Sequence, residues 1–308
     1  MALLEVHSLS KDFGGLRAID GLSFSLSPGE ILSIIGPNGA GKTTVFNVIT
    51  GIYPATTGTV VFDGQPLVET HERRSERVLR RLLTSLGGWI PKLPELILAR
   101  LGMAPILRPH DVVERGIART FQTIRLFPRL TVLENVMAGE HHRGRAGALG
   151  ALLRLPSERD EERRIVERAI QRLEFIGLAD KLNEIAHNLA YGDQRRLEIA
   201  RALATDPKLL VLDEPAAGLN EAEGLALMET IRRIRDKGVT ILLIEHDMKV
   251  VMGISDRISV FDYGTKIAEG NAAEIQANPK VIEAYLGPGG VALSEKYKKQ
   301  RLSYAQSH

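Results

Sequence analysis

The chain has 308 residues, of which 44% are apolar and 25% charged, and its formal net charge is +2. This composition is typical of a soluble globular protein, and so small a net charge gives no indication of nucleic-acid binding. The absence of cysteine excludes disulfides and thiolate metal sites. No window holds the roughly 18 uninterrupted apolar residues of a spanning helix. We therefore expect a chain that does not cross a membrane by itself, although it could dock on one that does.

The first part of the chain is predicted to be rich in strands. Residues 3–30 are typical of short strands broken by Gly and Pro. Residues 30–51, EILSIIGPNGAGKTTVFNVITG, indicate a buried strand, a glycine loop and a helix from about Thr43. In the following TTGTVVFDGQPL, Asp63-Gly64 is expected to form the turn between two more strands.

Residues 69–110 differ in character and predict a helical hairpin. Apolar residues recur at helical spacing on both sides of Gly87-Gly88, and Pro94 suits the first turn of a second helix. Eight basic residues stand against four acidic ones in this stretch. We favour a surface insertion. The alternative is contact with a partner or with anionic lipid headgroups through the basic residues and the apolar stripe around Trp89.

The second half alternates between helices and apolar strands. Helices are predicted at residues 157–180, 193–204 and 221–238, and buried strands within PKLLVLDEP and VTILLIEHD. This alternation favours a largely parallel sheet that is covered on both faces. The tail from residue 288 is rich in Gly, Lys and Ser and is expected to be loose.

The stretch GPNGAGKT, residues 36–43, matches the pattern G-x-x-x-x-G-K-[ST] of a phosphate-binding loop. Glycines let successive backbone N–H groups turn inward around phosphate oxygens, and the helix that follows directs its positive end at the same anion. Lys42 would reach the outer phosphates, and the Thr43 hydroxyl can bind magnesium. The alternative is a plain glycine turn, which the strand-loop-helix context disfavours.

Two acids end the buried strand LLVLDEP, at the edge of a parallel sheet where ligands bind. Asp213 could hold Mg²⁺, largely through water, and Glu214 could orient or deprotonate an attacking water. His246 ends the next strand and could bond a γ-phosphate or that water. Taken alone, each could equally be a solvated strand end. Gln122 alone carries no meaning without context. Phe13 is ambiguous: it could be a core residue, or it could offer a face on which a base stacks.

Taken together, five stretches resemble the ATP-binding subunits of ABC transporters in order and spacing: GPNGAGKTT, RTFQ, LAYGDQRRLEIARAL, LLVLDEPAAGLN and LLIEHDM. The resemblance covers roughly residues 4–287 except 69–110. It implies an α/β P-loop NTPase with a RecA-like core, an antiparallel β subdomain and a helical subdomain at about residues 123–200. The helical insertion and a flexible tail at residues 288–308 would be additions. Within the family, DEPAAGLN, IEHDMKVVMGISDRISV and VIEAYLG are most similar to the ATPase of branched-chain amino acid importers.

The resemblance implies a role for each matching residue. Glu214 would be the catalytic base, His246 the switch histidine, and residues 216–220 the D-loop. The residues implied to bind ATP are Phe13, Gly36, Pro37, Asn38, Gly39, Ala40, Gly41, Lys42, Thr43, Thr44, Gln122, Ala190, Tyr191 and Gly192. Those implied to hold Mg²⁺ are Thr43, Gln122 and Asp213.

The signature of the family is commonly Leu-Ser-Gly-Gly-Gln, whereas residues 189–193 here read Leu-Ala-Tyr-Gly-Asp. Ala190 lacks the hydroxyl that would donate to the γ-phosphate, a hydrogen bond worth roughly 1.5–3 kcal/mol. Asp193 would repel a triphosphate unless its carboxylate points away or pairs with Arg195 or Arg196. Branched-chain importers are similar in having Ala-Tyr here, usually with Gln in the place of Asp193, and we predict a competent ATPase.

The family also implies partners. Its members work as two ATPase subunits that face head to tail, with each nucleotide between one phosphate loop and the partner's signature. We expect a second ATPase subunit, either an identical copy or, as we favour, a paralogue. We also expect two membrane permeases and, indirectly, a periplasmic binding protein. The chain would lie peripherally on the cytoplasmic face of the membrane and bind no nucleic acid.

Two other functions are weighed against amino acid import. One is the ATPase of a lipid or lipopolysaccharide exporter or extractor, which shares much of this motif set. The other is an ABC ATPase that acts on nucleic acid or ribosomes. That class usually has two ATPase units in one chain or a long coiled-coil insertion, and this chain has neither.

Overall fold

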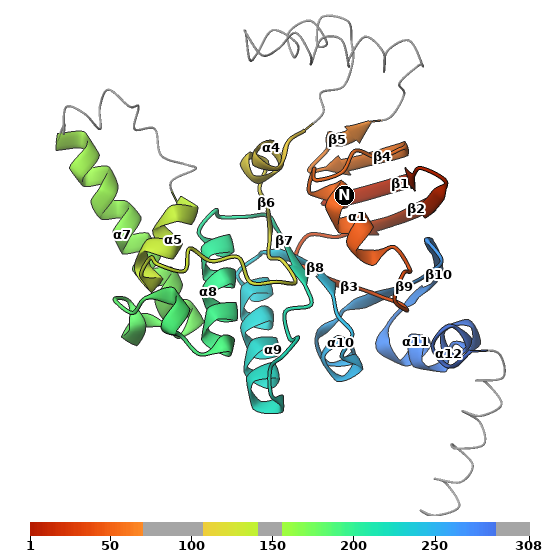
Figure 1. Cartoon of the computed structure of the whole chain (residues 1–308). Helices are drawn as coiled ribbons and strands as arrows, with labels where there is room; N and C mark the ends of the chain where they lie inside the picture. Colours follow the sequence, from red (N-terminus) through yellow and green to blue (C-terminus); the bar gives the residue numbers. More distant parts are fainter. Residues whose placement is uncertain (70–106, 141–155, 288–308) are drawn as a thin grey trace, which may run out of the picture. The chain divides into compact units, whose positions relative to one another are not determined.

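The structure is a computed structural model that describes residues 1–69, 107–140 and 156–287 (Figure 1). It separates into two compact units. The first unit comprises Met1–Ser27, Gly36–Val112 and Phe261–Ile267, and the second comprises Pro28–Ile35, Val113–Val260 and the chain from Ala268. Each unit is described by itself.

An antiparallel sheet forms the body of the first unit. Its order is β2-β1-β4-β5, with strands β1 (Leu4–Phe13), β2 (Leu16–Leu26), β4 (Thr57–Phe62) and β5 (Gln65–Glu69). The predicted turn at Asp63-Gly64 is confirmed, because both residues have the positive φ, 50° and 72°, of a tight hairpin turn. The prediction of short strands was wrong. Gly21, at φ 60°, lies within β2 beside an irregular register and does not end the strand.

Helix α1 (Lys42–Ile49) lies in the first unit and follows the glycine loop. It begins one residue before the predicted start. The apolar residues that it buries hold it against the rest of the unit: Val45, Phe46, Val48 and Ile49. Their burial fixes the position of the loop residues that precede the helix.

A second sheet has six strands in the order β10-β9-β3-β8-β7-β6; β3, β6, β7 and β8 belong to the second unit, whereas β9 and β10 include residues of both units. Its strands are β3 (Ile31–Ile35), β6 (Ile117–Arg119), β7 (Leu209–Asp213), β8 (Thr240–Ile244), β9 (Arg257–Asp262) and β10 (Thr265–Gly270). The pairs β9–β3, β3–β8, β8–β7 and β7–β6 are all parallel, which confirms the predicted parallel sheet. Every residue of β3, β7 and β8 is buried, as expected for strands covered on both faces.

Helices α8 (Tyr191–Leu203), α9 (Glu221–Asp236) and α10 (Met248–Ile254) share a core with β7 and β8. Alternate strand residues enter this core: Leu210, Leu212, Ile241 and Leu243. Helix α9 begins at a capping box in which Asn220 and Glu223 each accept the other's backbone N–H. Short helices α11 (Ala272–Ala277) and α12 (Pro279–Leu286) follow β10.

A helical region precedes β7 in the second unit. Helices α5 (Val132–Glu140) and α7 (Pro156–Ile176) pack on each other and on α8 (Figure 1). Two 3₁₀ turns, η2 (Ala179–Lys181) and η3 (Ala186–Asn188), lead into α8. These elements occupy the chain where the helical subdomain was predicted.

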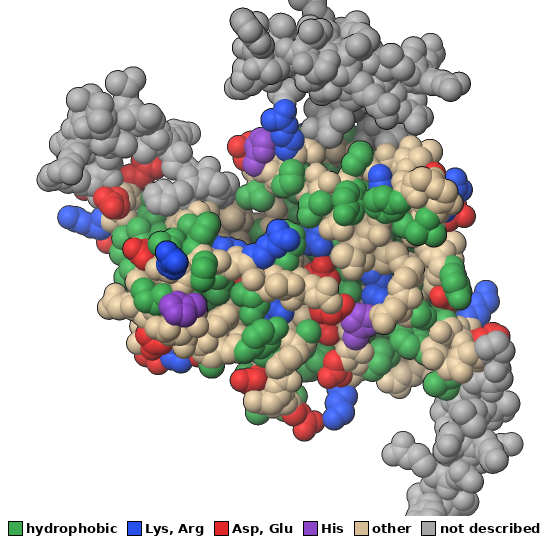
Figure 2. All heavy atoms as spheres, in the orientation of Figure 1, with side chains coloured by type: hydrophobic (Ala, Val, Ile, Leu, Met, Phe, Trp, Pro, Cys, Tyr) green, Lys and Arg blue, Asp and Glu red, His purple; other side chains and the backbone are tan. Residues whose placement is uncertain are grey.

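The predicted hairpin at residues 69–110 lies outside the described residues apart from its two ends, where β5 finishes and α4 (Pro109–Glu114) begins. The predicted tail at residues 288–308 also lies outside them. Among the described helices, none has the length and hydropathy needed to cross a bilayer. On the face shown in Figure 2, basic and acidic side chains are interspersed.

Candidate functional site

The glycine loop of the first unit connects β3 to α1 and holds the side chain of Lys42. The buried Nζ atom of Lys42 donates to the carbonyl oxygens of Gly36, at 2.7 Å, and Pro37, at 2.9 Å. The first backbone N–H groups of α1 have no acceptor within the helix. Together with the ammonium group they form a site suited to phosphate oxygens, which would take over Lys42 from the loop carbonyls.

Two glycines of this loop cannot be replaced without moving the backbone. Gly41 precedes α1 with φ 93°, and a Cβ atom there would lie 2.5 Å from the carbonyl oxygen of Ala18. A Cβ atom on Gly36 would lie 2.0 Å from the carbonyl oxygen of Phe261. Beyond Gly41 and Lys42, Thr43 is exposed and Thr44 half-buried, so the Thr43 side chain is accessible to a ligand.

Phe13 lies on the surface of the first unit, in an aromatic pair with Tyr53. The ring centroids are 5.3 Å apart and the rings meet edge to face at 82°. Phe13 is 41% exposed, and the Nζ atom of Lys11 lies 4.8 Å from its centroid. This arrangement leaves aromatic surface open to a base. No feature of the sequence indicated Tyr53.

In the second unit, Asp213 ends β7 and pairs with Arg119 at the end of β6. The Nη2 atom of Arg119 donates to Oδ2 of Asp213 at 2.8 Å, and both side chains are buried. Burial raises the pKa of Asp213 above its ordinary value, although the hydrogen bond and charge of Arg119 act against it. Sequence reasoning missed Arg119, because nothing local relates it to a residue so far along the chain.

The other oxygen of Asp213 fits a Mg²⁺ site. Oδ1 is buried and has no hydrogen-bond partner among the described residues. Magnesium commonly takes one or two carboxylates and fills its remaining positions with phosphate oxygens and water. Among the described residues, no three or more His, Cys, Asp or Glu side chains form a group that could hold a metal ion. A single carboxylate with a vacant oxygen is compatible with the pattern that Mg²⁺ requires.

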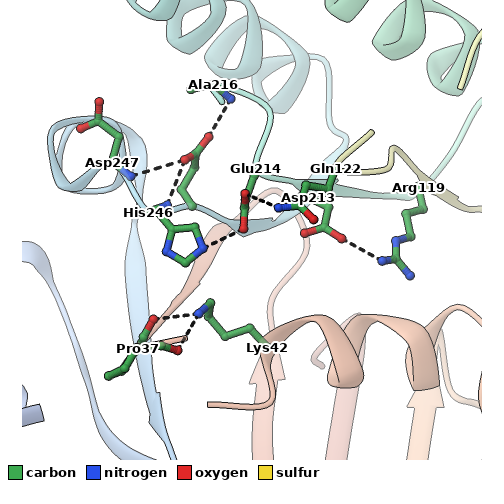
Figure 3. Close-up of polar contacts among 11 residues, drawn as sticks. Pro37, Lys42, Arg119, Gln122, Asp213, Glu214, Ala216, His246 and Asp247 are labelled. Atoms are coloured by element: carbon green, nitrogen blue, oxygen red, sulfur yellow. Dashed lines mark hydrogen bonds and ion pairs between the residues drawn. The ribbon is translucent and has the colours of Figure 1, made fainter. Parts of the chain in front are cut away.

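The carboxylate of Glu214 contacts two other predicted residues of the second unit, Gln122 and His246 (Figure 3). Gln122 donates from Nε2 to its Oε2 at 2.8 Å, and Nε2 of His246 lies 2.7 Å from its Oε1. The backbone of Glu214 has φ 49°, a left-handed conformation that costs a non-glycine residue free energy. Strain of this kind persists where the surroundings determine a side chain's direction. Gln122 and His246 hold the two oxygens of the Glu214 carboxylate, and the Glu214 side chain is 14% exposed.

Glu245 ties together the backbone on either side of this carboxylate. Its Oε1 accepts from the N–H of Ala216 at 2.7 Å, and its Oε2 accepts from the N–H of His246 at 3.0 Å. The Asp247 N–H, 3.5 Å from the same oxygen, adds a weaker contact. The side chain is buried, and burial raises its pKa. The sequence gives one indication of Glu245: it is an acidic residue that directly follows the apolar strand β8.

The segment that resembles the signature forms the N-terminus of α8. Ala190 is the N-cap, and its side chain offers the helix no hydrogen bond. Asp193 is buried and faces Lys181, whose Nζ donates to Oδ2 at 2.5 Å, and Arg196, which bonds Oδ1. Burial alone raises the pKa of Asp193, but Lys181 and Arg196 outweigh it and lower that pKa. The carboxylate therefore pairs within its own chain, with Arg196 but not with Arg195.

Arg195 lies fully buried in α8 and binds the loop that contains Gln122. Its Nη1 donates to the carbonyl oxygen of Phe121 at 2.8 Å, and its Nη2 to that of Gln122 at 2.9 Å. The same guanidinium reaches Tyr191 Oη at 3.1 Å and Glu198 Oε2 at 3.1 Å. A buried charge is costly unless it is well paired. This pairing fixes the start of α8 to the Gln122 loop.

The structure brings Gln122, Asp213, Glu214 and His246 into one cluster, with Arg119 and Glu245 as members that the sequence did not reveal. The glycine loop and Phe13 belong to the first unit, and Ala190 to Gly192 open α8 in the second. The catalytic, nucleotide-binding and metal-binding roles of these residues remain predictions.

Comparison with protein families gives two matches. The model described as "ABC transporter" matches residues 19–87 and 98–217. The model described as "Branched-chain amino acid ATP-binding cassette transporter" matches residues 265–287. The two matches leave the C-terminal segment beyond residue 287 uncovered.

Similar curated proteins carry branched-chain amino acid transport in their names. The high-affinity branched-chain amino acid transport ATP-binding protein LivG of Escherichia coli K12 is 46% identical over 92% of this chain and 98% of its own length. The corresponding protein BraF of Pseudomonas aeruginosa is 41% identical over the same shares. Among solved structures, a nucleotide-free ATP-binding cassette from an ABC transporter superposes with a TM-score of 0.72. It is 32% identical over 94% of this chain and 100% of that one.

Proposed function

This chain belongs to the ATP-binding subunits of ABC transporters, and we propose from that premise that it hydrolyses ATP to power the import of branched-chain or related amino acids. The observation that carries the ATPase activity is Glu214, whose carboxylate is held by Gln122 and His246 at 2.8 and 2.7 Å. The substrate class follows from the names of the relatives and from the match at residues 265–287.

ATP would bind through its phosphates to residues 36–44. Backbone N–H groups of the loop and the N-terminus of α1 would surround the anion, and Lys42 would exchange its loop carbonyls for phosphate oxygens. Phe13, beside Tyr53, would stack on the adenine. Mg²⁺, held by Asp213, Thr43 and Gln122, would neutralise charge on the phosphates.

Glu214 would orient and deprotonate the water that attacks the γ-phosphate. Because Gln122 and His246 each bind one carboxylate oxygen, they determine where the free lone pairs of Glu214 point. Glu245 fixes the backbone of His246 and Ala216 and so supports the same arrangement. His246 would contact the γ-phosphate or the water as the nucleotide arrives.

A second ATPase subunit would meet the N-terminus of α8. Ala190 offers no hydroxyl, so backbone N–H groups and the positive end of the 13-residue helix would bind the partner's γ-phosphate. Asp193 does not oppose this, because Lys181 and Arg196 occupy both of its oxygens. We favour a paralogous partner, two permeases and a peripheral position on the cytoplasmic face of the membrane.

The substitution Glu214→Gln tests the activity. Glutamine keeps the shape of the side chain but cannot act as a base. ATP should therefore still bind, while turnover should fall about 10²–10⁴-fold. Glu229→Gln, which changes an exposed glutamate of α9, is the control and should leave both unchanged. Undiminished turnover in Glu214→Gln would remove Glu214 from the mechanism.

The membrane subunits that co-purify with a tagged chain test the substrate class. Two permeases that transport leucine in proteoliposomes would support import. Co-purification with membrane proteins that move lipid or lipopolysaccharide would contradict it, while leaving the ATPase activity intact.

A further inference from the structure

One short segment of the second unit, which begins with β6, binds two adjacent acids of the cluster, Asp213 and Glu214. Strand β6 pairs in parallel with β7, with Arg119 opposite Val211. From this segment, Arg119 binds Asp213 at 2.8 Å, and Gln122 binds Glu214 at 2.8 Å (Figure 3). Arg119 and Gln122, three residues apart on one segment, therefore bind the carboxylates of Asp213 and Glu214, which are adjacent at the end of β7.

The Arg119–Asp213 pair is buried on both sides. The side chains are 7% and 3% exposed, so neither charge is well hydrated. Burial lowers the pKa of Arg119 and raises the pKa of Asp213, while each partner acts against the other's shift. The two groups therefore stabilise each other's charged forms. Removal of either one would leave a buried charge without its main counter-ion.

Asp213 is also the carboxylate to which the proposed function assigns Mg²⁺. Its Oδ1 is buried and has no hydrogen-bond partner among the described residues, and its Oδ2 is held by Arg119. A divalent cation that approaches this carboxylate meets a guanidinium already bound to it. Two cations on one carboxylate repel each other strongly in a site of low polarity.

We propose that Arg119 is the internal counter-cation of Asp213 in the nucleotide-free protein, and that Mg²⁺ entering with a nucleotide displaces it. The inference rests on the proposed function, because it takes Asp213 as the magnesium ligand. Arg119 acts on the metal site through Asp213: it pairs with the buried carboxylate and occupies Oδ2 until the metal takes its place.

Arg119 has a second contact beside the carboxylate. Its Cζ atom lies 5.1 Å from the ring centroid of Phe121, within the range of a cation–π interaction. A guanidinium released from Asp213 can therefore stay against the ring. Arg195 of α8 donates to the carbonyl oxygens of Phe121 and Gln122. Movement of the segment from Arg119 to Gln122 would therefore also shift the start of α8.

Binding of Mn²⁺ in place of Mg²⁺ tests the exchange without any measurement of turnover. Electron paramagnetic resonance counts free Mn²⁺ in a titration of the purified chain with ADP present. Arg119→Met removes the competing charge at similar volume, so Mn²⁺ should bind about tenfold more tightly than to the wild type. Arg172→Met on α7, which breaks the more exposed pair of Arg172 with Asp206, should change nothing. Equal affinity in the wild type and a folded Arg119→Met variant would overturn the proposal.

A measurement on the wild type keeps the proposal testable if Arg119→Met does not fold. Guanidinium ¹⁵N resonances report hindered rotation of a bound arginine, and Arg119→Lys identifies the signal. Addition of Mg²⁺ and ADP should release the Arg119 signal into fast rotation. A signal that stays hindered would overturn the exchange. A wild-type protein that binds neither ADP nor Mn²⁺ would instead contradict the proposed function, and the inference with it.

Discussion

His246 Nε2 lies 2.7 Å from Oε1 of Glu214, and Glu214 adopts a left-handed backbone conformation to meet it. The two residues lie just beyond the ends of neighbouring parallel strands, since β7 and β8 pair along their full lengths and the N–H of Glu214 donates to the carbonyl oxygen of Ile244. The sheet thus brings the backbones together, and the unusual φ turns the carboxylate towards the imidazole.

Replacement of His246 by alanine should reduce turnover more than binding. The change removes one of the two side chains that hold Glu214, and a hydrogen bond to a charged group is worth about 1.5–3 kcal/mol. If all of that is expressed in the transition state, kcat falls about 10- to 100-fold. Steady-state ATPase assays and equilibrium binding of ATP would separate the two effects. His110→Ala, a change at an exposed histidine, is the control, and an unaltered kcat in His246→Ala would contradict the role of this contact.

Replacement of Glu245 by glutamine should also impair turnover, although this residue contacts no other side chain of the cluster. An amide has one acceptor oxygen, whereas the carboxylate serves Ala216 with one oxygen and His246 with the other. One backbone segment is therefore released. We expect a fall in kcat of about tenfold with ATP affinity retained, and full activity in Glu229→Gln. Loss of ATP binding in step with kcat would indicate general disruption instead.

Asp193 should stabilise the fold in a pH-dependent way. Lys181 and Arg196 lower the pKa of its carboxyl in the folded chain, so the stabilisation is present above the ordinary aspartate pKa of about 3.9 and is lost as pH falls through the lowered value. Asp193→Asn should cost about 1–3 kcal/mol of unfolding free energy at pH 7. The difference from the wild type should shrink as pH falls below about 4. Urea titrations at several pH values measure this, with Asp206→Asn as the exposed control. A difference that does not vary with pH would contradict it.

The sequence alone predicts those parts of the fold and of the candidate site that depend on short local patterns. The glycine loop, the acid pair at a strand end and the parallel sheet all follow from local periodicity and residue type. Gln122 and His246 became meaningful through the resemblance, and the structure places both on Glu214. Backbone strain at Glu214 has no sequence pattern, because the φ of a single residue is set by what surrounds it.

The partners of the cluster could not be predicted, because long-range pairing decides them. Arg119 and Asp213 are 94 residues apart, and Arg195 binds carbonyl oxygens that any residue type would supply. The sequence left two choices for Asp193, and the structure selects Arg196 together with Lys181, which was not considered. Only the fold determines which charged groups of distant segments become neighbours.

Arg195 should contribute both to the free energy of unfolding and to the position of the loop that contains Gln122. It is fully buried, with hydrogen bonds to Phe121, Gln122, Tyr191 and Glu198, so Arg195→Met leaves Glu198 without its ion partner. Loss of one member of a buried pair costs about 3–5 kcal/mol. Tyr191→Phe removes a single bond of the same guanidinium and should cost only about 1 kcal/mol. Chemical denaturation measures both, and Arg232→Met on α9 is the matched control because that arginine is 37% exposed and its partner Glu229 is 63% exposed. If Arg195→Met were no less stable than Arg232→Met, the buried network would not be what fixes α8 to the Gln122 loop.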